Sequence, residues 1–170
     1  WFKSGSLVPE PSFFDCHACH HPMNDQRWQA SELQGGLPTG AVRLNDAPLT
    51  MLRVIAARKA PELANELVNA TRNWHKASLV SRDAVVSAGA TLNAVLDRIE
   101  TTFRKSDFSN ADLQGIVNDL FDQAGKGEYR DYTSAEQAVM AIDMIVITRG
   151  ANDRLKSDVD KLYLLVEDEN

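Results

Sequence analysis

The chain has 170 residues, of which 44% are hydrophobic and 25% are charged, so we expect one soluble globular domain rather than a disordered or fibrous protein. The formal net charge of −6 and the lack of a basic stripe interleaved with aromatic residues argue against nucleic acid as a partner. No apolar run in the sequence approaches the length of a membrane-spanning helix. Because the chain begins Trp1-Phe2-Lys3 without an initiator Met, we expect a mature product or a piece of a longer protein.

Residues 1–44 differ in composition from the rest and are expected to form a loop-rich segment. They hold both cysteines, three of the four histidines and four of the six prolines. Gly35-Gly36 and Pro38-Thr39-Gly40 mark turns within it. This part is too polar and too interrupted to fold around an apolar core of its own, and a bound cofactor would supply one.

The loop-rich segment contains the pattern Cys-x-x-Cys-His, formed by Cys16, Cys19 and His20. This spacing is the attachment signature of haem c. Two thiols have to reach the two vinyl groups along one porphyrin edge, and the residue after the second cysteine then places an imidazole nitrogen on the iron. The motif therefore predicts haem c bound to Cys16 and Cys19, with His20 as the proximal iron ligand.

Three other interpretations of the two cysteines stay open. A thioredoxin-like redox pair would need a βαβ setting, which the pattern of apolar residues does not indicate. A zinc site would need a fourth ligand, usually from a second cysteine pair, and the sequence has no second pair. The third interpretation is a pair of structural thiols, although a bridge across so short a loop would constrain little of the unfolded chain.

The sixth iron ligand has to come from across the porphyrin plane. His21 is adjacent to His20 and cannot reach that face, and Met23 is nearly as constrained. We favour His75, which would keep the reduction potential low, whereas a methionine would raise it. An open site and three methionines are the alternatives: Met51, Met140 and Met144. The last two lie on a helical stripe and are expected to fill the core.

Two further histidines are His17, inside the motif, and His21, directly after it. In a crowded array of haems, His21 could ligate a neighbouring haem rather than the haem of its own motif. His17 lies inside the attachment loop, where we expect it to be exposed and without a role.

From Asn45 onward, apolar residues recur every three or four positions, a spacing that is typical of one face of a helix. Asp46 is expected to cap the first helix through its side chain. Pro61 is expected to break or restart that helix, because proline cannot donate a backbone hydrogen bond. Ser109 is expected to cap a later helix.

The last predicted helix begins at Thr133-Ser134-Ala135-Glu136, which has the form of a capping box. Gly150 is expected to bend or interrupt it. The sequence therefore predicts a mainly α fold, with a bundle of about four helices in residues 45–170 behind the loop-rich segment of residues 1–44.

The segment from Phe13 to Trp28 resembles the last attachment site of multihaem c-type cytochromes of the cytochrome c-554-like family. A final haem site followed by a long helical tail is also similar to the ends of multihaem nitrite and hydroxylamine oxidoreductases. The resemblance implies a periplasmic or otherwise extracytoplasmic protein that passes electrons between haems, with redox proteins or neighbouring haem domains as partners. Such families carry several attachment motifs, whereas this chain has one.

We therefore expect a c-type cytochrome or cytochrome domain that transfers electrons through covalently bound haem. The alternative is the terminal helical region of a multihaem oxidoreductase acting on small nitrogen or sulfur compounds, and a haem-reporting sensor module is a third hypothesis. The sequence shows no nucleophile–base pair and no glycine-rich phosphate loop, so we expect an electron-transfer protein rather than a catalyst by itself. Copies of the chain could associate through the long helices.

Overall fold

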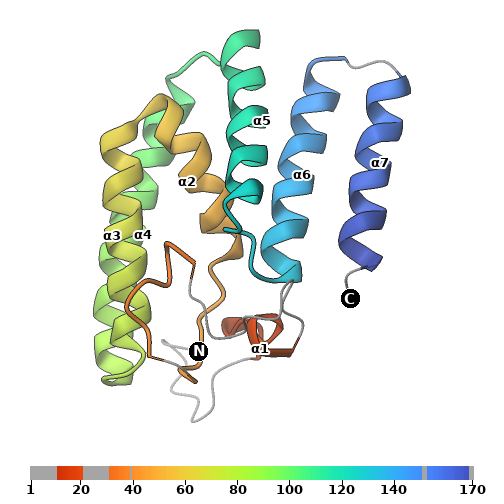
Figure 1. Ribbon diagram of the computed structural model, residues 1–170. Helices are drawn as coiled ribbons and strands as arrows, with labels where there is room; N and C mark the ends of the chain where they lie inside the picture. The colour runs from red at the N-terminus through yellow and green to blue at the C-terminus, as the bar shows by residue number, and fades with distance from the viewer. Residues whose placement is uncertain (1–10, 21–30, 39, 151–152, 169–170) are drawn as a thin grey trace.

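The computed structural model describes residues 11–20, 31–38, 40–150 and 153–168, and most of this part is helical (Figure 1). A 3-10 turn η1 (Pro11–Phe13) and a one-turn helix α1 (His17–His20) come first. The long helices are α2 (Ala47–Lys59), α3 (Pro61–Ala77), α4 (Arg82–Arg104), α5 (Asn110–Gly125), α6 (Tyr132–Thr148) and α7 (Asp153–Asp168). The mainly α prediction is confirmed, but these ranges contain six long helices instead of about four. None of them combines the length and the apolar character that crossing a membrane requires.

Two local breaks separate helices that the sequence pattern could also join. Helix α2 ends at Lys59 and α3 begins at Pro61, so the predicted restart at this proline is confirmed. Helix α6 ends at Thr148, and Gly150 follows with a φ of +65°, a backbone conformation that glycine adopts without a steric penalty. The predicted last helix is therefore two helices, α6 and α7.

Side-chain caps stabilise the beginnings of three described helices, including α4, where the Ser81 hydroxyl accepts from the backbone N–H of Ala84. The Ser109 hydroxyl accepts from the backbone N–H of Asp112, and the Asp112 carboxylate accepts from the backbone N–H of Ser109, so the predicted cap of α5 is confirmed. Helix α6 begins earlier than predicted, because the Asp131 carboxylate accepts from the backbone N–H of Ser134 at 2.8 Å. The capping box predicted at residues 133–136 is therefore wrong by two residues.

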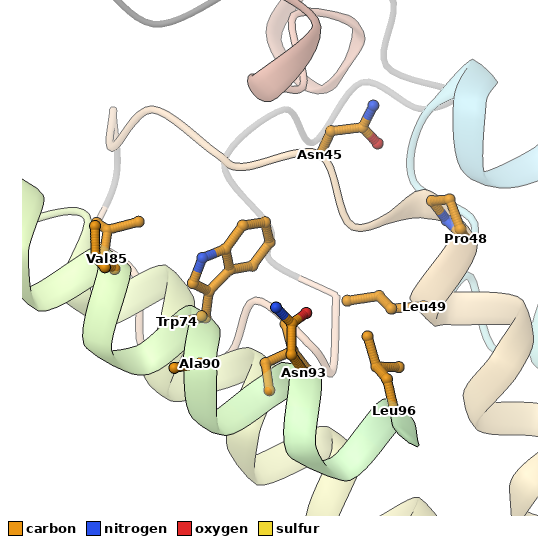
Figure 2. A pocket seen from close by; sticks show the side chains of 11 residues that line it. Asn45, Pro48, Leu49, Trp74, Val85, Ala90, Asn93 and Leu96 are labelled. Carbon is orange, nitrogen blue, oxygen red and sulfur yellow. The ribbon is translucent and has the colours of Figure 1, made fainter. Parts of the chain in front are cut away.

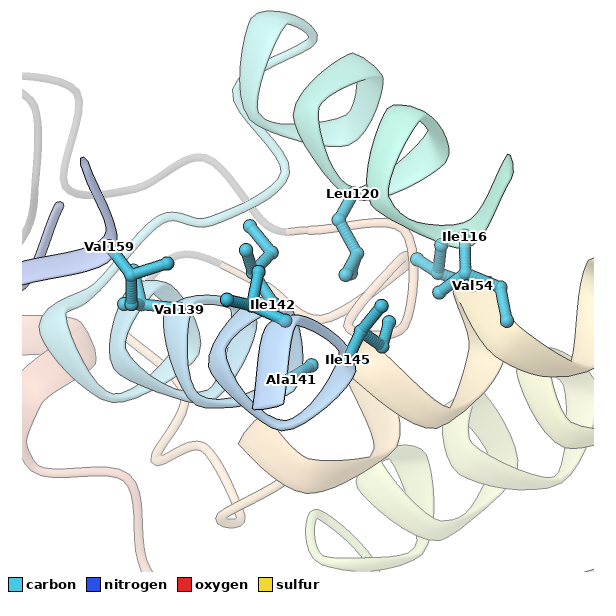
Figure 3. Packing of buried hydrophobic residues seen from close by; sticks show 9 residues of the cluster. Val54, Ile116, Leu120, Val139, Ala141, Ile142, Ile145 and Val159 are labelled. Carbon is cyan, nitrogen blue, oxygen red and sulfur yellow. The ribbon is translucent and has the colours of Figure 1, made fainter. Parts of the chain in front are cut away.

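Helix α2 lies in the middle of the bundle, between the α3–α4 pair and the α5, α6 and α7 helices (Figure 1). Its Val54 packs into what we call the α5–α6 cluster, together with Ile116, Leu120, Ile142 and Ile145 (Figure 3). Its Ala56 packs into a second group, the α3–α4 cluster, whose other members include Leu67, Leu92, Val95 and Ile99. Both hydrophobic clusters therefore depend on the same central helix.

The cap of α5 makes a testable contribution to acid stability. The Lys59 ammonium lies 2.7 Å from the Asp112 carboxylate, and this contact together with Ser109 lowers the Asp112 pKa to about 2. A carboxyl whose pKa is lower in the folded than in the unfolded chain stabilises the fold above its unfolded pKa, near 3.9. That contribution is lost as the pH falls toward 2. We expect the urea midpoint to fall over this range.

The Asp112→Asn variant is the control, because its amide cannot titrate. Its urea midpoint should fall less steeply than that of the wild type between about pH 4 and 2. Equal slopes for the two proteins would contradict the assignment of this acid sensitivity to Asp112.

Candidate haem attachment site

Residues 16–20, which we call the attachment turn, form a single turn of helix. Cys16 immediately precedes α1, and Cys19 and His20 lie within it. The backbone N–H of His20 donates to the Cys16 carbonyl oxygen at 3.0 Å. Residues four apart lie on the same side of a helix, and the side chains of Cys16 and His20 are both exposed. A thiol and an imidazole presented together at the surface suit the chemistry of haem c attachment.

A short antiparallel pairing connects the attachment turn to the bundle. The backbone of Phe14 bridges Leu44, the N–H of Asp15 donates to the Arg43 carbonyl at 2.9 Å, and the N–H of Asn45 donates to the Phe13 carbonyl at 3.1 Å. We call residues 13–15 and 43–45 the pairing segment. It ends directly before Cys16 on one side and directly before Asp46 on the other, so it links the attachment turn to the beginning of α2.

Aromatic contacts place the attachment turn at one end of the bundle. The Phe13 ring meets Trp74 of α3 edge-on, with ring centroids 5.7 Å apart. The His17 ring lies 5.6 Å from the ring of Tyr132, the first residue of α6. Burial raises the pKa of the Tyr132 phenol, and the carboxylates of Glu136 and Glu167 raise it further. His17 is half-buried, so the prediction that it is exposed is wrong, because this tyrosine covers part of its ring.

His75 lies in the interior of the protein, within what we call the buried histidine cluster of His75, Asp46 and Gln34. The imidazole is 0% exposed, and its Nε2 lies 2.8 Å from Asp46 Oδ2. The second Asp46 oxygen accepts from Gln34 Nε2 at 3.2 Å. The part of the chain that the structure describes gives His75 Nδ1 no hydrogen-bond partner. The assignment of His75 as sixth iron ligand stays a prediction.

The same cluster corrects the expectation for Asp46. This residue precedes α2 as predicted, but its carboxylate makes no capping hydrogen bond. The donors of His75 and Gln34 occupy its two oxygens instead. Asp46, whose position before α2 predicts a helix cap, therefore binds side chains that are distant in the sequence instead.

The methionine candidates for the iron lie on α2 and α6. Met140 and Met144 are 45% and 61% exposed on α6, so the expectation that they fill the core is wrong. Helix α6 buries its small and branched residues against α2, α5 and α7. The side of the helix that carries Met140 and Met144 therefore faces outward. Met51 is half-buried against the α5–α6 cluster. His21 lies outside the described residues, and so does the side chain of Cys19.

A buried arginine of α2, which the sequence analysis did not single out, holds the segment around Glu32. Arg53 of α2 forms an ion pair with Glu32 and donates to the Gln123 side chain at 2.8 Å. The Glu32 backbone N–H donates to the Glu128 carboxylate at 2.9 Å, and its carbonyl accepts from Arg72 of α3 at 2.8 Å. The sequence carries one signal for the role of Arg53, because this charged residue interrupts the apolar pattern in the middle of α2.

A pocket of about 530 Å³ opens beside the pairing segment, between α3, α4 and the beginning of α2. Figure 2 shows the indole of Trp74 facing Leu49 and Leu96 across the opening, with Asn45 of the pairing segment above them. Its size lies in the range of small-molecule sites, and apolar side chains form most of its walls. Trp74 thus contributes both to this pocket and to the contact with Phe13.

No protein-family model, no curated protein and no solved structure matches this chain. Within the described ranges, no three His, Cys, Asp or Glu side chains form a group that could hold a metal ion. The function has to be inferred from the chemistry of the attachment turn and from the contacts that position it.

Proposed function

We propose that this chain is a c-type cytochrome domain that carries electrons on one covalently bound haem c. Cys16 and Cys19 would form the thioether bonds, each S–H adding across one vinyl group, and His20 would be the proximal iron ligand. The iron of the bound haem supplies the one-electron couple. The observation that most supports this proposal is the folding of Cys-x-x-Cys-His into one helical turn with Cys16 and His20 exposed.

Exposure matters because the attachment turn has to be accessible to the haem. The Cys16 thiol and the His20 imidazole are both at the surface, so the bundle need not unfold for them to react. The backbone hydrogen bonds of the pairing segment meanwhile link the turn to the residues that directly precede α2. The proposal includes an extracytoplasmic location and redox proteins or neighbouring haem domains as electron partners.

The test is expression of the chain with an export signal in cells that contain a cytochrome c maturation system. We expect a polypeptide mass increased by one haem, stable to denaturation, and a pyridine haemochrome count of one haem per chain. The Cys16→Ala/Cys19→Ala double variant, produced in the same way, should have the mass of the polypeptide alone. A colourless wild-type protein of polypeptide mass would overturn the proposal.

The spectrum of the haem-loaded protein separates electron transfer from catalysis. A six-coordinate low-spin spectrum in both oxidation states would support an electron carrier. A high-spin haem that binds small nitrogen or sulfur compounds would instead favour the terminal region of a multihaem oxidoreductase.

A further inference from the structure

We propose that the last turn of α3 positions the attachment turn, with His75 and Asp46 as the positioning pair. The coupling would run through the pairing segment rather than through contact with the haem. Its consequence for the haem rests on the proposed function, but the coupling itself is a property of the polypeptide and can be tested without haem.

The first step is the contact between α3 and the beginning of α2. His75 Nε2 donates to Asp46 Oδ2 at 2.8 Å, with the two side chains 0% and 2% exposed. Water cannot replace a partner at this depth, so separating the pair leaves a buried polar group unsatisfied. The side chain of Asp46 is therefore held at a fixed place against α3.

The second step is the connection from Asp46 to the motif. Residues 43–45 directly precede Asp46 and pair with residues 13–15, which directly precede Cys16. Hydrogen bonds of 2.9 and 3.1 Å join the two strands of the pairing segment. A shift of Asp46 would therefore be transmitted to the backbone at the attachment turn.

The third step is that adjacent residues of α3 contact both strands of the pairing segment. His75 binds Asp46, which continues the 43–45 strand, while Trp74 packs its ring against Phe13 in the other strand. The Trp74 and His75 rings are themselves 5.7 Å apart. One turn of α3 thus fixes the pairing segment from both sides, which a purely local stabilising contact would not require.

The test in the polypeptide without haem is amide hydrogen exchange at Asp15 and Asn45, whose N–H groups form the two bonds of the pairing segment. In His75→Leu, which cannot donate to Asp46, we expect both amides to exchange roughly ten- to hundredfold faster than in the wild type. In His75→Gln, whose amide nitrogen can replace the donor, we expect exchange close to that of the wild type. In His75→Leu the acceleration at Asp15 and Asn45 should exceed that of amides within α5, which report on global unfolding.

Ile99→Ala is the matched control, because Ile99 is 1% exposed in the α3–α4 cluster and its truncation weakens the bundle at a residue outside the pairing segment and the buried histidine cluster. In this variant the exchange at Asp15 and Asn45 should be accelerated no more than that of amides within α5, which report on global unfolding. If Ile99→Ala accelerates these two amides relative to those of α5 as much as His75→Leu does, or if His75→Leu leaves them protected, the positioning role is wrong.

The haem-loaded protein provides a second readout. The positioning role is an alternative to the prediction that His75 is the sixth iron ligand. In His75→Leu we therefore expect the reduction potential to shift while any low-spin absorption bands of the wild-type haem are retained, because the surroundings of the attachment turn change but the ligands of the iron do not. Loss of the low-spin bands would overturn the positioning role in favour of direct iron ligation by His75. A chain that binds no haem would end the proposed function and leave the exchange experiment intact.

Discussion

Replacing Asp46 by alanine is expected to lower the free energy of unfolding by about 3 kcal/mol. The carboxylate accepts from His75 Nε2 and from Gln34 Nε2, and these two side chains are 0% and 2% exposed. Removing it leaves two donors buried without an acceptor, and each unsatisfied buried group costs about 1–3 kcal/mol. Urea unfolding of the polypeptide at neutral pH, followed by circular dichroism, measures the difference.

Asp131→Ala is the comparison variant, because Asp131 is equally buried and also directly precedes a helix. Its carboxylate accepts from the Ser134 N–H as an ordinary cap, so its loss should cost about 1 kcal/mol. If Asp46→Ala proves no more destabilising than Asp131→Ala, Asp46 is acting as a simple helix cap and the buried histidine cluster contributes little.

Replacing Leu67 by alanine is expected to lower the free energy of unfolding by about 3–4 kcal/mol. Leu67 is 0% exposed at the centre of the α3–α4 cluster, where Ala56 from α2 and Leu92 from α4 also pack. The loss combines the transfer energy of the removed carbons with the cavity that close-packed neighbours cannot fill. The measurement is again the urea transition.

Leu164→Ala tests whether the loss of stability expected for Leu67→Ala results from burial rather than from the residue type. Leu164 is 59% exposed on α7, so truncating it should change stability by no more than about 0.5 kcal/mol. A large effect at Leu164 would mean that this side of α7 is covered in the folded protein.

The sequence predicted well those features that neighbouring residues determine. The restart at Pro61 depends on the missing N–H of proline, and the cap at Ser109 depends on an acidic residue three positions later. The cap of α6 was misplaced because Asp131 and Thr133 both belong to types that favour this position, and the sequence does not say which is used.

Features that depend on distant partners could not be predicted in this way. Asp46 was expected to cap α2, but its carboxylate forms a hydrogen bond with His75, which lies 29 positions away in the sequence. The outward position of Met140 follows from which sides of α6 its neighbouring helices cover. Helical periodicity identifies an apolar stripe but does not reveal whether another element packs on it.

The central position of α2 has a consequence for how the molecule loses its structure. Val54 and Ala56, two residues apart, belong to different hydrophobic clusters, so neither cluster can stay intact once α2 melts. Helices α2 to α6 should therefore melt together as one cooperative unit with a shared transition temperature. Helix α7 buries Val159 and exposes Leu155, Leu164 and Leu165, so it is the element that can fray first without disturbing that unit.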